Sequence, residues 1–441
     1  MQINELAKII RESGIVGCGG AGFPAYAKLN MDADTIILNC AECEPLLKLH
    51  SQLLEKYTYE IMSALNLIAE TVEADNIIIA TKRSYKDTVE KIQSFLDAFK
   101  NIKLSFLPEV YPAGDEVVAI YETTGRVVPP GKLPITVGVT VFNVETVYNI
   151  YCALNNAKAV THKYVTIAGE VKNPVTLCVP VGATVKDVLK YAGGITCENP
   201  VYLIGGPMTG KIGTGYSVIT KTTNAVIVLP EEHYVINKKK SNVSVDMKRA
   251  MASCCQCQMC TDMCPRYLLG HPIEPHIFMR NATSGMVDDS KPYLNTMFCS
   301  QCGLCEMYAC TQGLAPKSLM AVCKDTLKKE KVKFSENIDS SAVKNERNYR
   351  KVPLKRIVSR LGLKKYNIEA PLNEVELKFK EYKILLSQGI GAPAIPIVKK
   401  GDVVSLGQVI ANHSDGLGVS VHSSCDGKIK DITDKFILIV A

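Results

Sequence analysis

The chain has 441 residues, of which 47% are hydrophobic and 22% are charged, and its formal net charge is +7. This length allows three or four domains, and the composition is typical of a soluble globular protein. The charge is too small to indicate nucleic-acid binding, although it favours acidic protein partners. No apolar run approaches the roughly 20 residues that a membrane-spanning helix needs, so we expect no transmembrane segment.

Cysteine is the most informative residue type, with 17 in the chain. The N-terminal segment MQINELAKIIRESG lacks the apolar core and the cleavage site of a signal peptide. Disulfides are rare in the cytosol. We therefore expect a cytoplasmic protein whose grouped cysteines bind metal rather than form disulfides.

The first part of the chain, to about residue 155, alternates helical and strand patterns. Four isoleucine and leucine residues share one face of a predicted helix over residues 3–13, and a glycine-rich loop follows. Because strands and helices alternate, we expect a mostly parallel sheet with helices on both faces, which is an α/β fold. The expected strands are Thr35–Cys40, Asn76–Thr81 and Lys103–Leu107, and the expected helices are about 51–73 and 85–100.

The pattern then changes. Short β-type runs around one helix, Thr184–Ala192, predict a compact α+β module over 163–230. The polar stretch Asn237–Ser244 predicts a linker, and residues 372–441 predict a small all-β barrel or sandwich. Residues 344–366 hold nine Lys or Arg and one Glu. Such a charge run favours a solvated linker with one amphipathic helix over a docking surface for an acidic redox partner.

A first run of cysteines reads Cys254-x2-Cys257-x2-Cys260-x3-Cys264-Pro265. Three thiolates at this spacing wrap one corner of an iron–sulfur cubane, and the proline stops the loop from continuing as a helix. This is the spacing of bacterial ferredoxins, in which the fourth cysteine ligates the other cluster. The run therefore predicts a [4Fe–4S] site.

A second run reads Cys299-x2-Cys302-x2-Cys305-x4-Cys310, with a longer last gap and with Thr311 in place of proline. The first three spacings hold, so we expect a second [4Fe–4S] cluster. The crossed ligation of two-cluster ferredoxins then predicts two sets of ligands. They are Cys254, Cys257, Cys260 and Cys310 for one cluster, and Cys299, Cys302, Cys305 and Cys264 for the other.

Zinc is the alternative for these cysteines, since C-x2-C pairs also suit zinc. A zinc site needs two such pairs, however, and not two runs of four, so the doubled pattern favours clusters. Cys255 adjoins a ligand but falls outside the register. The remaining cysteines are scattered through the chain, and buried free cysteines often act as small hydrophobic residues.

The glycine-rich loop contains Gly17-x-Gly19-x-x-Gly22, with Glu42 and Glu44 about twenty residues further on, which fits the dinucleotide fingerprint. That fingerprint should follow a strand and open a helix. Here a helix precedes the loop and a strand comes next, so the context argues against a standard Rossmann NAD site. Adjacent glycines still let backbone N–H groups approach a phosphate or a flat ring, although a simple tight turn is the alternative.

Polar side chains follow the first predicted strand. Asn39, Glu42 and Glu44 lie just past its end, and ligands of open α/β sheets bind beyond the carboxyl ends of strands. A solvated loop is the alternative for the two carboxylates.

At residues 17–28 (GCGGAGFPAYAK) and 39–45 (NCAECEP) the chain resembles the FMN-binding segments of the flavin subunit of respiratory complex I and of the C subunit of Rnf electron-transport complexes. Further segments carry the same resemblance. They are 111–116 and 143–146 for the flavin site, 205–208 for the soluble-ligand-binding β-grasp module, 352–366, and 391–410 with 421–429 for the Rnf C-subunit barrel-sandwich domain.

In Rnf C subunits the barrel-sandwich domain comes first, whereas here it comes last. This order, with the altered second cysteine run, is most similar to the cobalamin reductases of propanediol-utilisation microcompartments. The resemblance implies a multidomain α/β protein with five segments. They are a Rossmann-like FMN/NADH-binding domain (1–158), a β-grasp ligand-binding module (159–235), a ferredoxin-like domain with two [4Fe–4S] clusters (245–330), a basic linker (331–370) and a barrel-sandwich hybrid domain (371–441).

The resemblance also implies roles for individual residues of the flavin site. Gly17, Gly19, Gly20 and Lys28 would hold the FMN phosphate and ring, and Asn39 and Glu42 would bind the ribityl chain and the ring edge. Glu44 would lie where nicotinamide stacks, although Ala41 replaces an acidic residue of the complex I subunit at this site. The pocket would be closed by Gly114, Asp115 and Asn143.

The implied activity is that of an NADH-dependent flavin and iron–sulfur oxidoreductase that reduces oxidised cobalamin. The alternative is an Rnf-C-like electron relay to a protein partner, with no small-molecule acceptor of its own. The flavin is required because a hydride delivers two electrons whereas a [4Fe–4S] cluster takes one. A microcompartment shell or a dehydratase or transferase partner fits the resemblance, as does a cytoplasmic location inside a bacterial microcompartment. No nucleic-acid partner is expected.

Overall fold

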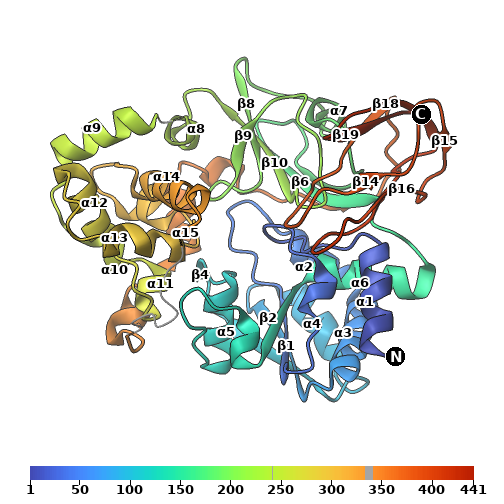
Figure 1. Cartoon of the computed structure of the whole chain (residues 1–441), viewed down its shortest axis with the longest axis horizontal. Helices are drawn as coiled ribbons and strands as arrows, with labels where there is room; N and C mark the ends of the chain where they lie inside the picture. The colour runs from blue at the N-terminus through green and yellow to red at the C-terminus, as the bar shows by residue number, and fades with distance from the viewer. Residues whose placement is uncertain (241, 333–340) are drawn as a thin grey trace.

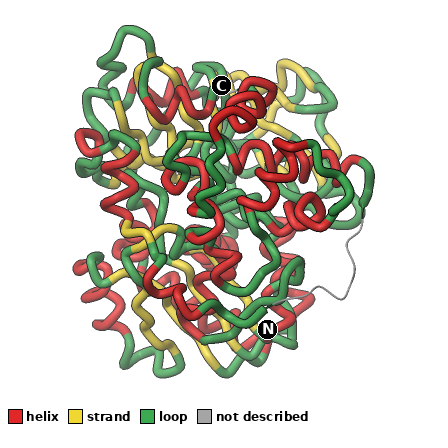
Figure 2. The backbone as a smooth tube through the Cα atoms, turned by 90° about the vertical axis from the view of Figure 1, so that its left-hand side faces the viewer, coloured by secondary structure: helices red, strands yellow, loops and turns green. Residues whose placement is uncertain are grey.

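The computed structural model describes residues 1–240, 242–332 and 341–441. Figure 1 shows the N-terminal α/β unit in blue and teal, a β-rich unit in green beside the C-terminal unit in red, and the cysteine region in yellow and orange at the opposite side. Figure 2 turns the cysteine region toward the viewer and shows its short helices in front of the strands of the other units.

The N-terminal unit is built on a parallel four-stranded sheet of order β3-β2-β1-β5. Strands β1 and β5 are buried on almost every residue, as expected for a parallel sheet covered on both faces. The chain builds β1, β2 and β3 in one direction and then places β5 on the other side of β1, so the strand order reverses between β1 and β5. The strands are β1 (Thr35–Asn39), β2 (Asn76–Lys82), β3 (Ile102–Leu107) and β5 (Val139–Asn143).

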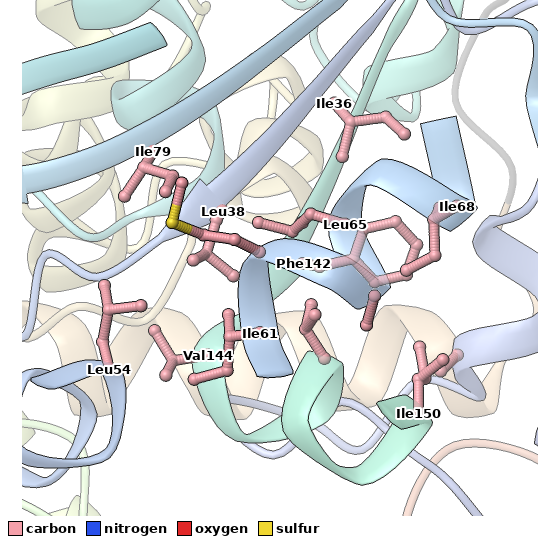
Figure 3. Packing of buried hydrophobic residues seen from close by; sticks show 14 of the residues in the cluster. Ile36, Leu38, Leu54, Ile61, Leu65, Ile68, Ile79, Phe142, Val144 and Ile150 are labelled. Atoms are coloured by element: carbon pink, nitrogen blue, oxygen red, sulfur yellow. The ribbon is translucent and has the colours of Figure 1, made fainter. Parts of the chain in front are cut away.

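Helices cover both faces of this sheet, as the sequence predicts. Alternate side chains of β1 explain the two layers: Ile36 and Leu38 pack into one hydrophobic cluster and Ile37 into another. Figure 3 shows the first cluster, in which Leu65 and Phe142 lie between the sheet and its helices. The first cluster takes residues from α1 (Ile3–Glu12), α2 (Leu49–Lys56), α3 (Thr58–Val72), α4 (Lys86–Phe95) and α6 (Val144–Asn156), and the second from α5 (Glu116–Thr124).

The prediction of a single helix over about 51–73 is wrong, because the structure has two helices that meet at Tyr57. Tyr57 leaves the helical conformation with φ −117° and ψ 39°. Its ring stacks on Tyr148 with centroids 4.2 Å apart, and its hydroxyl donates to Glu374 at 2.5 Å. Contacts with residues distant in sequence thus override a continuous helical pattern.

The second unit is a six-stranded mixed sheet of order β12-β7-β6-β10-β8-β9 with one short helix. Thr184 caps that helix by accepting a hydrogen bond from Asp187 N, as its position in the sequence predicts. Its elements are β6 (His162–Gly169), β7 (Val175–Pro180), α7 (Val185–Lys190), β8 (Pro200–Ile204), β9 (Lys211–Gly213), β10 (Ala225–Pro230) and the distant β12 (Leu372–Asn373).

The cysteine region is mostly short helices around its own core. The stretch Asn237–Ser244, for which composition predicts a linker, is helical at both ends, and Asn242 caps the second helix by accepting from Ser244 N at 2.9 Å. The helices are α8 (Tyr234–Lys239), α9 (Val243–Ser253), α10 (Met259–Asp262), α11 (Pro265–Leu268), α12 (Pro275–Ser284), α13 (Lys291–Leu294), η3 (Asn295–Phe298), η4 (Cys305–Ala309) and α14 (Pro316–Lys329).

The segment after the cysteine region returns to the N-terminal unit. Residues 333–340, part of the expected basic linker, lie outside the described residues. Next come η5 (Asn345–Tyr349), β11 (Val352–Pro353), α15 (Leu354–Arg360) and η6 (Lys364–Tyr366). β11 pairs antiparallel with β4 (Val110–Tyr111), and α15 buries Ile357 and Val358 in a core shared with the β-grasp and cysteine regions.

The C-terminal unit is all-β, as the sequence predicts, and consists of two small sheets. One has the order β13-β19-β18-β15 and the other β14-β16-β17. They are formed by β13 (Glu381–Leu385), β14 (Ile395–Pro396), β15 (Val403–Val404), β16 (Val409–Asn412), β17 (Val421–His422), β18 (Gly427–Ile432) and β19 (Phe436–Val440).

Within the described ranges, none of the helices has both the length and the apolar character needed to cross a membrane.

Leu65→Ala should lower the free energy of unfolding of the N-terminal unit by about 2–5 kcal/mol, because Leu65 is fully buried between α3 and the sheet. Urea unfolding followed by circular dichroism measures the effect. Leu67→Ala in the same helix is the matched control, since Leu67 is half-buried, and its loss should be clearly smaller. Equal losses would contradict this packing.

Candidate functional site

The carboxyl ends of β1 and β5 bring two predicted site residues together. Asn39 and Asn143 end these strands and are register partners across the parallel pair. Asn39 Nδ2 donates to Gly114 O at 3.0 Å, and Asn143 Oδ1 accepts from Glu145 N at 3.0 Å, which caps α6. The strand order reverses at this point, and open α/β sheets bind ligands at such reversals.

The glycine-rich loop lies against the same edge of the sheet. Cys18 N donates to Thr146 Oγ1 in the first turn of α6 at 3.0 Å, and Gly17 N donates to Phe23 O at 2.8 Å. A Cβ atom at Gly19 would stand 2.5 Å from Asn143 Nδ2, whereas one at Gly20 would have no neighbour within 4 Å. The loop therefore packs tightly on one side and leaves exposed backbone beside the N-terminus of a 13-residue helix.

Glu42 is the most unusual group at this edge. Its side chain is 4% exposed. Oε2 accepts from His50 N at 3.0 Å, while Oε1 is buried with no hydrogen-bond partner. Burial raises the pKa of the Glu42 carboxyl to about 7, and burial lowers the pKa of His50 to about 3. His50 is therefore neutral, and its Nε2 lies 3.0 Å from Asn143 Nδ2.

The structure places three other predicted residues at the rim. Lys28 Nζ donates to Glu116 Oε1 at 2.9 Å and to Val141 O at 2.7 Å. Asp115 caps α5 by accepting from Val117 N at 3.1 Å. A Cβ atom at Gly114 would stand 2.6 Å from Ala41 O, so the 111–116 segment packs directly on the loop that follows β1.

Glu44 turns away from this edge toward the β-grasp unit. Its carboxylate accepts hydrogen bonds from Met208 N and Thr209 N, both at 2.8 Å. A Cβ atom at Gly206 would stand 2.3 Å from the Glu44 carboxyl carbon, so a side chain there would displace the Glu44 carboxylate. The segment 205–208, which the sequence links to the β-grasp module, thus holds one of the predicted flavin-site residues.

These features fit a flavin mononucleotide. Exposed glycine backbone at a helix N-terminus suits a phosphate. A buried Glu42 oxygen without a hydrogen-bond partner, and two asparagine side chains at the ends of neighbouring strands, suit the polar edge of a ring and its ribityl chain.

The cysteines of the two runs gather in the two quartets that crossed ligation predicts. In the part of the chain that the structure describes, no group of three or more His, Cys, Asp or Glu side chains is placed to hold a single metal ion. The quartets instead line two separate hollows. The first hollow takes Cys254, Cys257, Cys260 and Cys310, and the second takes Cys264, Cys299, Cys302 and Cys305.

The backbone around the quartets has the form that an iron–sulfur cluster needs. Gln256, Gln258 and Gln301 all have positive φ, which turns the chain tightly between the cysteines. Gln301 N donates to Cys299 Sγ at 3.4 Å, and Leu314 N donates to Cys310 Sγ at 3.2 Å. Hydrogen bonds to the sulfur ligands are one of the means by which proteins tune such clusters.

The second hollow is joined to the sheet edge by two contacts. Arg266, two residues after Cys264, donates to Asp115 Oδ2 at 2.9 Å. Tyr111 Oη donates to Cys302 O at 2.5 Å. Both contacts come from the 111–116 segment, so the same segment borders the glycine-loop site and the second quartet.

Several residues of the site were not predicted from the sequence. His50, Lys82 and Arg266 are buried or nearly so, and each bonds to a predicted site segment; Lys82 donates to Glu42 O. A lysine that ends a buried strand, as Lys82 does, is an unusual pattern that could have signalled its role. Nothing in the spacing of His50 or Arg266 marks either residue.

The basic stretch 344–366 is only partly paired within the molecule, since its residues Lys355, Arg356, Arg360 and Lys364 are exposed. Arg347 and Lys351 both pair with Glu122, at 2.6 and 2.8 Å, and Lys365 pairs with Glu170 at 2.7 Å. Arg347 is buried. The paired residues anchor the stretch to α5 and to the β-grasp unit, while its exposed basic residues lie on the surface.

A switch-point site of flavin type, next to one of two cysteine quartets, defines a flavin and iron–sulfur electron-transfer protein. Comparison with known families agrees. Residues 10–152 match the Nuo51 FMN-binding domain, 164–211 the SLBB domain, 253–315 the 4Fe-4S dicluster domain and 358–439 the RnfC barrel sandwich hybrid domain.

Two relatives of nearly the same length identify the family within this class of electron-transfer proteins. The chain is 38% identical to cobalamin reductase PduS of Citrobacter freundii over 98% of this chain and 95% of the relative, and 36% identical to PduS of Salmonella typhimurium over 100% and 97%. It belongs to the PduS cobalamin reductase family and is an oxidoreductase, which confirms the predicted resemblance, fold class and enzyme assignment.

Two further proteins are similar to parts of this chain. The C subunit of the proton-translocating ferredoxin:NAD(+) oxidoreductase complex of Clostridium ljungdahlii is 31% identical over 61% of this chain and 57% of that one. An NAD+-reducing [NiFe]-hydrogenase in the H2-reduced state shares the fold with a TM-score of 0.50 at 17% identity, over 76% of this chain and 63% of that one.

Gly19→Ala and Gly20→Ala should separate packing from flavin binding. Gly19→Ala pushes a methyl group into Asn143 and should lower both thermal stability and FMN content. Gly20→Ala meets open space, so the fold should keep its melting temperature. If the loop holds the phosphate, this variant should nevertheless lose FMN, by about tenfold or more in affinity. Unchanged FMN affinity in Gly20→Ala would place the phosphate elsewhere.

Glu42 should make the flavin-free protein less stable as the pH rises. Its folded pKa of about 7 lies above the usual value of 4.5, so the folded state binds the extra proton between these values. The stabilisation is complete below pH 4.5 and is lost as the pH rises through 7, by roughly 3 kcal/mol at most. Denaturant unfolding at pH 5 and pH 8 should show this loss in the wild type relative to Glu42→Gln. A difference between the two proteins that does not change with pH would contradict the burial of this carboxyl.

Proposed function

We propose that this chain transfers electrons from NADH, through FMN and two [4Fe–4S] clusters, to oxidised cobalamin. The observation that carries the proposal is the direct contact between the switch-point site and the second cysteine quartet. Arg266 and Tyr111 fix that quartet against the segment that borders the flavin-type site. The names of the full-length relatives supply the acceptor, cobalamin.

The flavin site is assigned to the predicted residues as follows. The loop of Gly17, Gly19 and Gly20 holds the phosphate at the N-terminus of α6, with Lys28 at its rim. Asn39, Glu42 and Asn143 face the ribityl chain and the ring edge, and Gly114 and Asp115 close the pocket. Glu44, which the β-grasp turn holds through Met208 N and Thr209 N, positions the wall on which nicotinamide would stack.

Glu42 has a specific part in this assignment. A carboxyl whose pKa is about 7 is partly protonated near neutral pH. Its unpaired Oε1 can therefore donate a hydrogen bond to a ring atom or accept one, without placing a full charge in a buried site. Neutral His50 holds Asn143 in place on the other side.

The iron–sulfur sites are assigned to the two quartets. FMN supplies the conversion between a two-electron hydride and single electrons, and each cluster carries one electron at a time. The residues of the chain bind and orient these groups, exclude water from the second hollow, and set the distance between them.

The alternative is a relay that passes electrons only to a protein partner. Its predicted docking surface is the basic stretch 344–366. Arg347 and Lys351 share the single carboxylate of Glu122, whereas Lys355, Arg356 and Arg360 are exposed, so the stretch keeps charge for steering. Reduction of a small-molecule acceptor is preferred because the full-length relatives are named cobalamin reductases.

Anaerobic reconstitution with iron, sulfide and FMN tests the proposal. Added NADH should bleach the flavin and cluster absorption bands, and aquacobalamin should then restore them as Co(III) is reduced. If NADH leaves the absorption bands unchanged while a low-potential donor reduces the clusters, the result would favour the relay instead.

Cysteine variants test the assignment of the clusters in the same preparation. Cys257→Ala and Cys302→Ala should each lose about half of the bound iron, because each removes a ligand of a different quartet. Cys323→Ala is the control, since Cys323 lines neither hollow, and it should keep its full iron content. Iron content that is equal in all three variants would contradict the assignment.

A further inference from the structure

The two hollows differ in their surroundings. The second borders the flavin-type site through Arg266 and Tyr111, and Gly303 in its lining packs on Met208 of the turn that holds Glu44. The first has no such contact with the 111–116 segment among the hydrogen bonds of the described residues. Figure 1 shows α10 and α12, which flank the first hollow, on the side of the cysteine region away from the C-terminal unit.

The first hollow also opens to solvent. Cys257, Gln256, Gln258 and Gln312 line it and are exposed. In the second hollow, by contrast, Cys305 is buried and the other three cysteines are half-buried. Electrons that enter at the flavin site therefore meet the second quartet first and can leave to an external acceptor from the first.

The mouth of the first hollow has a distinctive chemistry. Its lining contains three glutamine side chains and no Lys, Arg, Asp or Glu among the described residues, whereas Arg266 and Lys317 line the second. Exposed Met251 lies in the last turn of α9, just before Cys254. An acidic or basic protein partner would find no opposite charge in this lining. A flat, largely apolar macrocycle with amide groups around its rim would find amide partners and an apolar surface.

We propose that the first hollow is the electron exit and that a corrinoid docks at its mouth, with the corrin amides bonded to Gln258 and Gln312. This inference rests on the proposed function and adds the place of reduction to it. For each hydride that the donor loses, two corrinoid molecules each gain one electron, Co(III) becomes Co(II), and one proton is released. The corrinoid does not need to reach the flavin.

Cys255 gives a readout of docking that does not depend on turnover. It is exposed, it lines the first hollow, and it falls outside both predicted ligand sets. On the reconstituted, oxidised protein, excess cyanocobalamin should slow the labelling of Cys255 by N-ethylmaleimide at least fivefold. Cyanocobalamin is the probe because its cyanide ligand resists displacement by thiols. Half-buried Cys197 in the β-grasp unit is the internal control, and its labelling rate should not change.

Gln258→Leu/Gln312→Leu removes both amides at nearly constant volume. The double variant should lose the protection of Cys255 and should raise the KM for aquacobalamin about tenfold, because two hydrogen bonds are lost. The rate of flavin bleaching by the electron donor, a step that precedes the first hollow, should stay within twofold of the wild type. Gln93→Leu, at an exposed position of α4 far from the cysteine region, is the matched control and should change neither value.

The outcomes separate this inference from the proposed function. A wild type that reduces cobalamin while Cys255 is labelled equally with and without cyanocobalamin would overturn the docking site and leave the function intact. Protection of Cys197 in place of Cys255 would overturn docking at the first hollow and indicate that the corrinoid binds to the β-grasp unit. If cyanocobalamin protects Cys255 but the wild type reduces no cobalamin, docking is supported and the proposed function is refuted. If Cys255 is not protected and no cobalamin is reduced, the docking site and the proposed function are both refuted.

Discussion

The ion pair between Asp115 and Arg266 is the contact on which the arrangement of the two redox regions depends. Both side chains are nearly buried, at 10% and 16% exposure, and their nearest atoms are 2.9 Å apart. Asp115 also caps α5 through Val117 N and Val118 N, so its carboxylate has partners on both oxygens. Removing one partner of such a pair leaves an uncompensated buried charge and typically costs about 3–5 kcal/mol. The pair therefore ties the start of α5 to the residue that follows Cys264 and Pro265.

The position of this pair explains why the flavin-type site and the second quartet share a wall. α5 covers the opposite face of the sheet from α3 and α6. Because α5 follows β3 and precedes the parallel strand β5, its N-terminus lies at the carboxyl edge of the strands. The same edge carries Asn39 and Asn143. Any segment that docks at the start of α5 is brought next to the switch point, and the segment that docks there is the end of the first cysteine run. The reversal of strand order and this ion pair together bring the proposed flavin site and the second cysteine quartet side by side.

Local patterns in the sequence predicted the helices and strands because their causes are local. The alternation of strand and helix patterns predicted the parallel sheet, and the C-x2-C-x2-C spacing predicted which cysteines turn around one centre. The break at Tyr57 could not be predicted, since it follows from contacts with Tyr148 and Glu374 that lie 91 and 317 residues away in sequence. The partners of Glu44 and Asp115 were missed for the same reason. The glycine motif alone indicated a nucleotide, but the pairing of β1 with β5 was needed to locate the site.

Residues far along the chain, including the C-terminal unit, contact the glycine-rich loop of the N-terminal unit. Ile390 N donates to Gly22 O at 3.1 Å, and a Cβ atom at Gly389 would stand 2.3 Å from that same oxygen. Buried Lys221 of the β-grasp unit donates to Gly14 O at 2.7 Å and to Ser420 O at 3.1 Å. The glycine-rich loop is thus held by two units that follow it by 200 residues or more, while the backbone at Gly19 and Gly20 stays exposed. Because a loop of adjacent glycines has high conformational entropy, these contacts reduce the cost of ordering it. The last unit of the chain therefore stabilises the glycine-rich loop near its beginning.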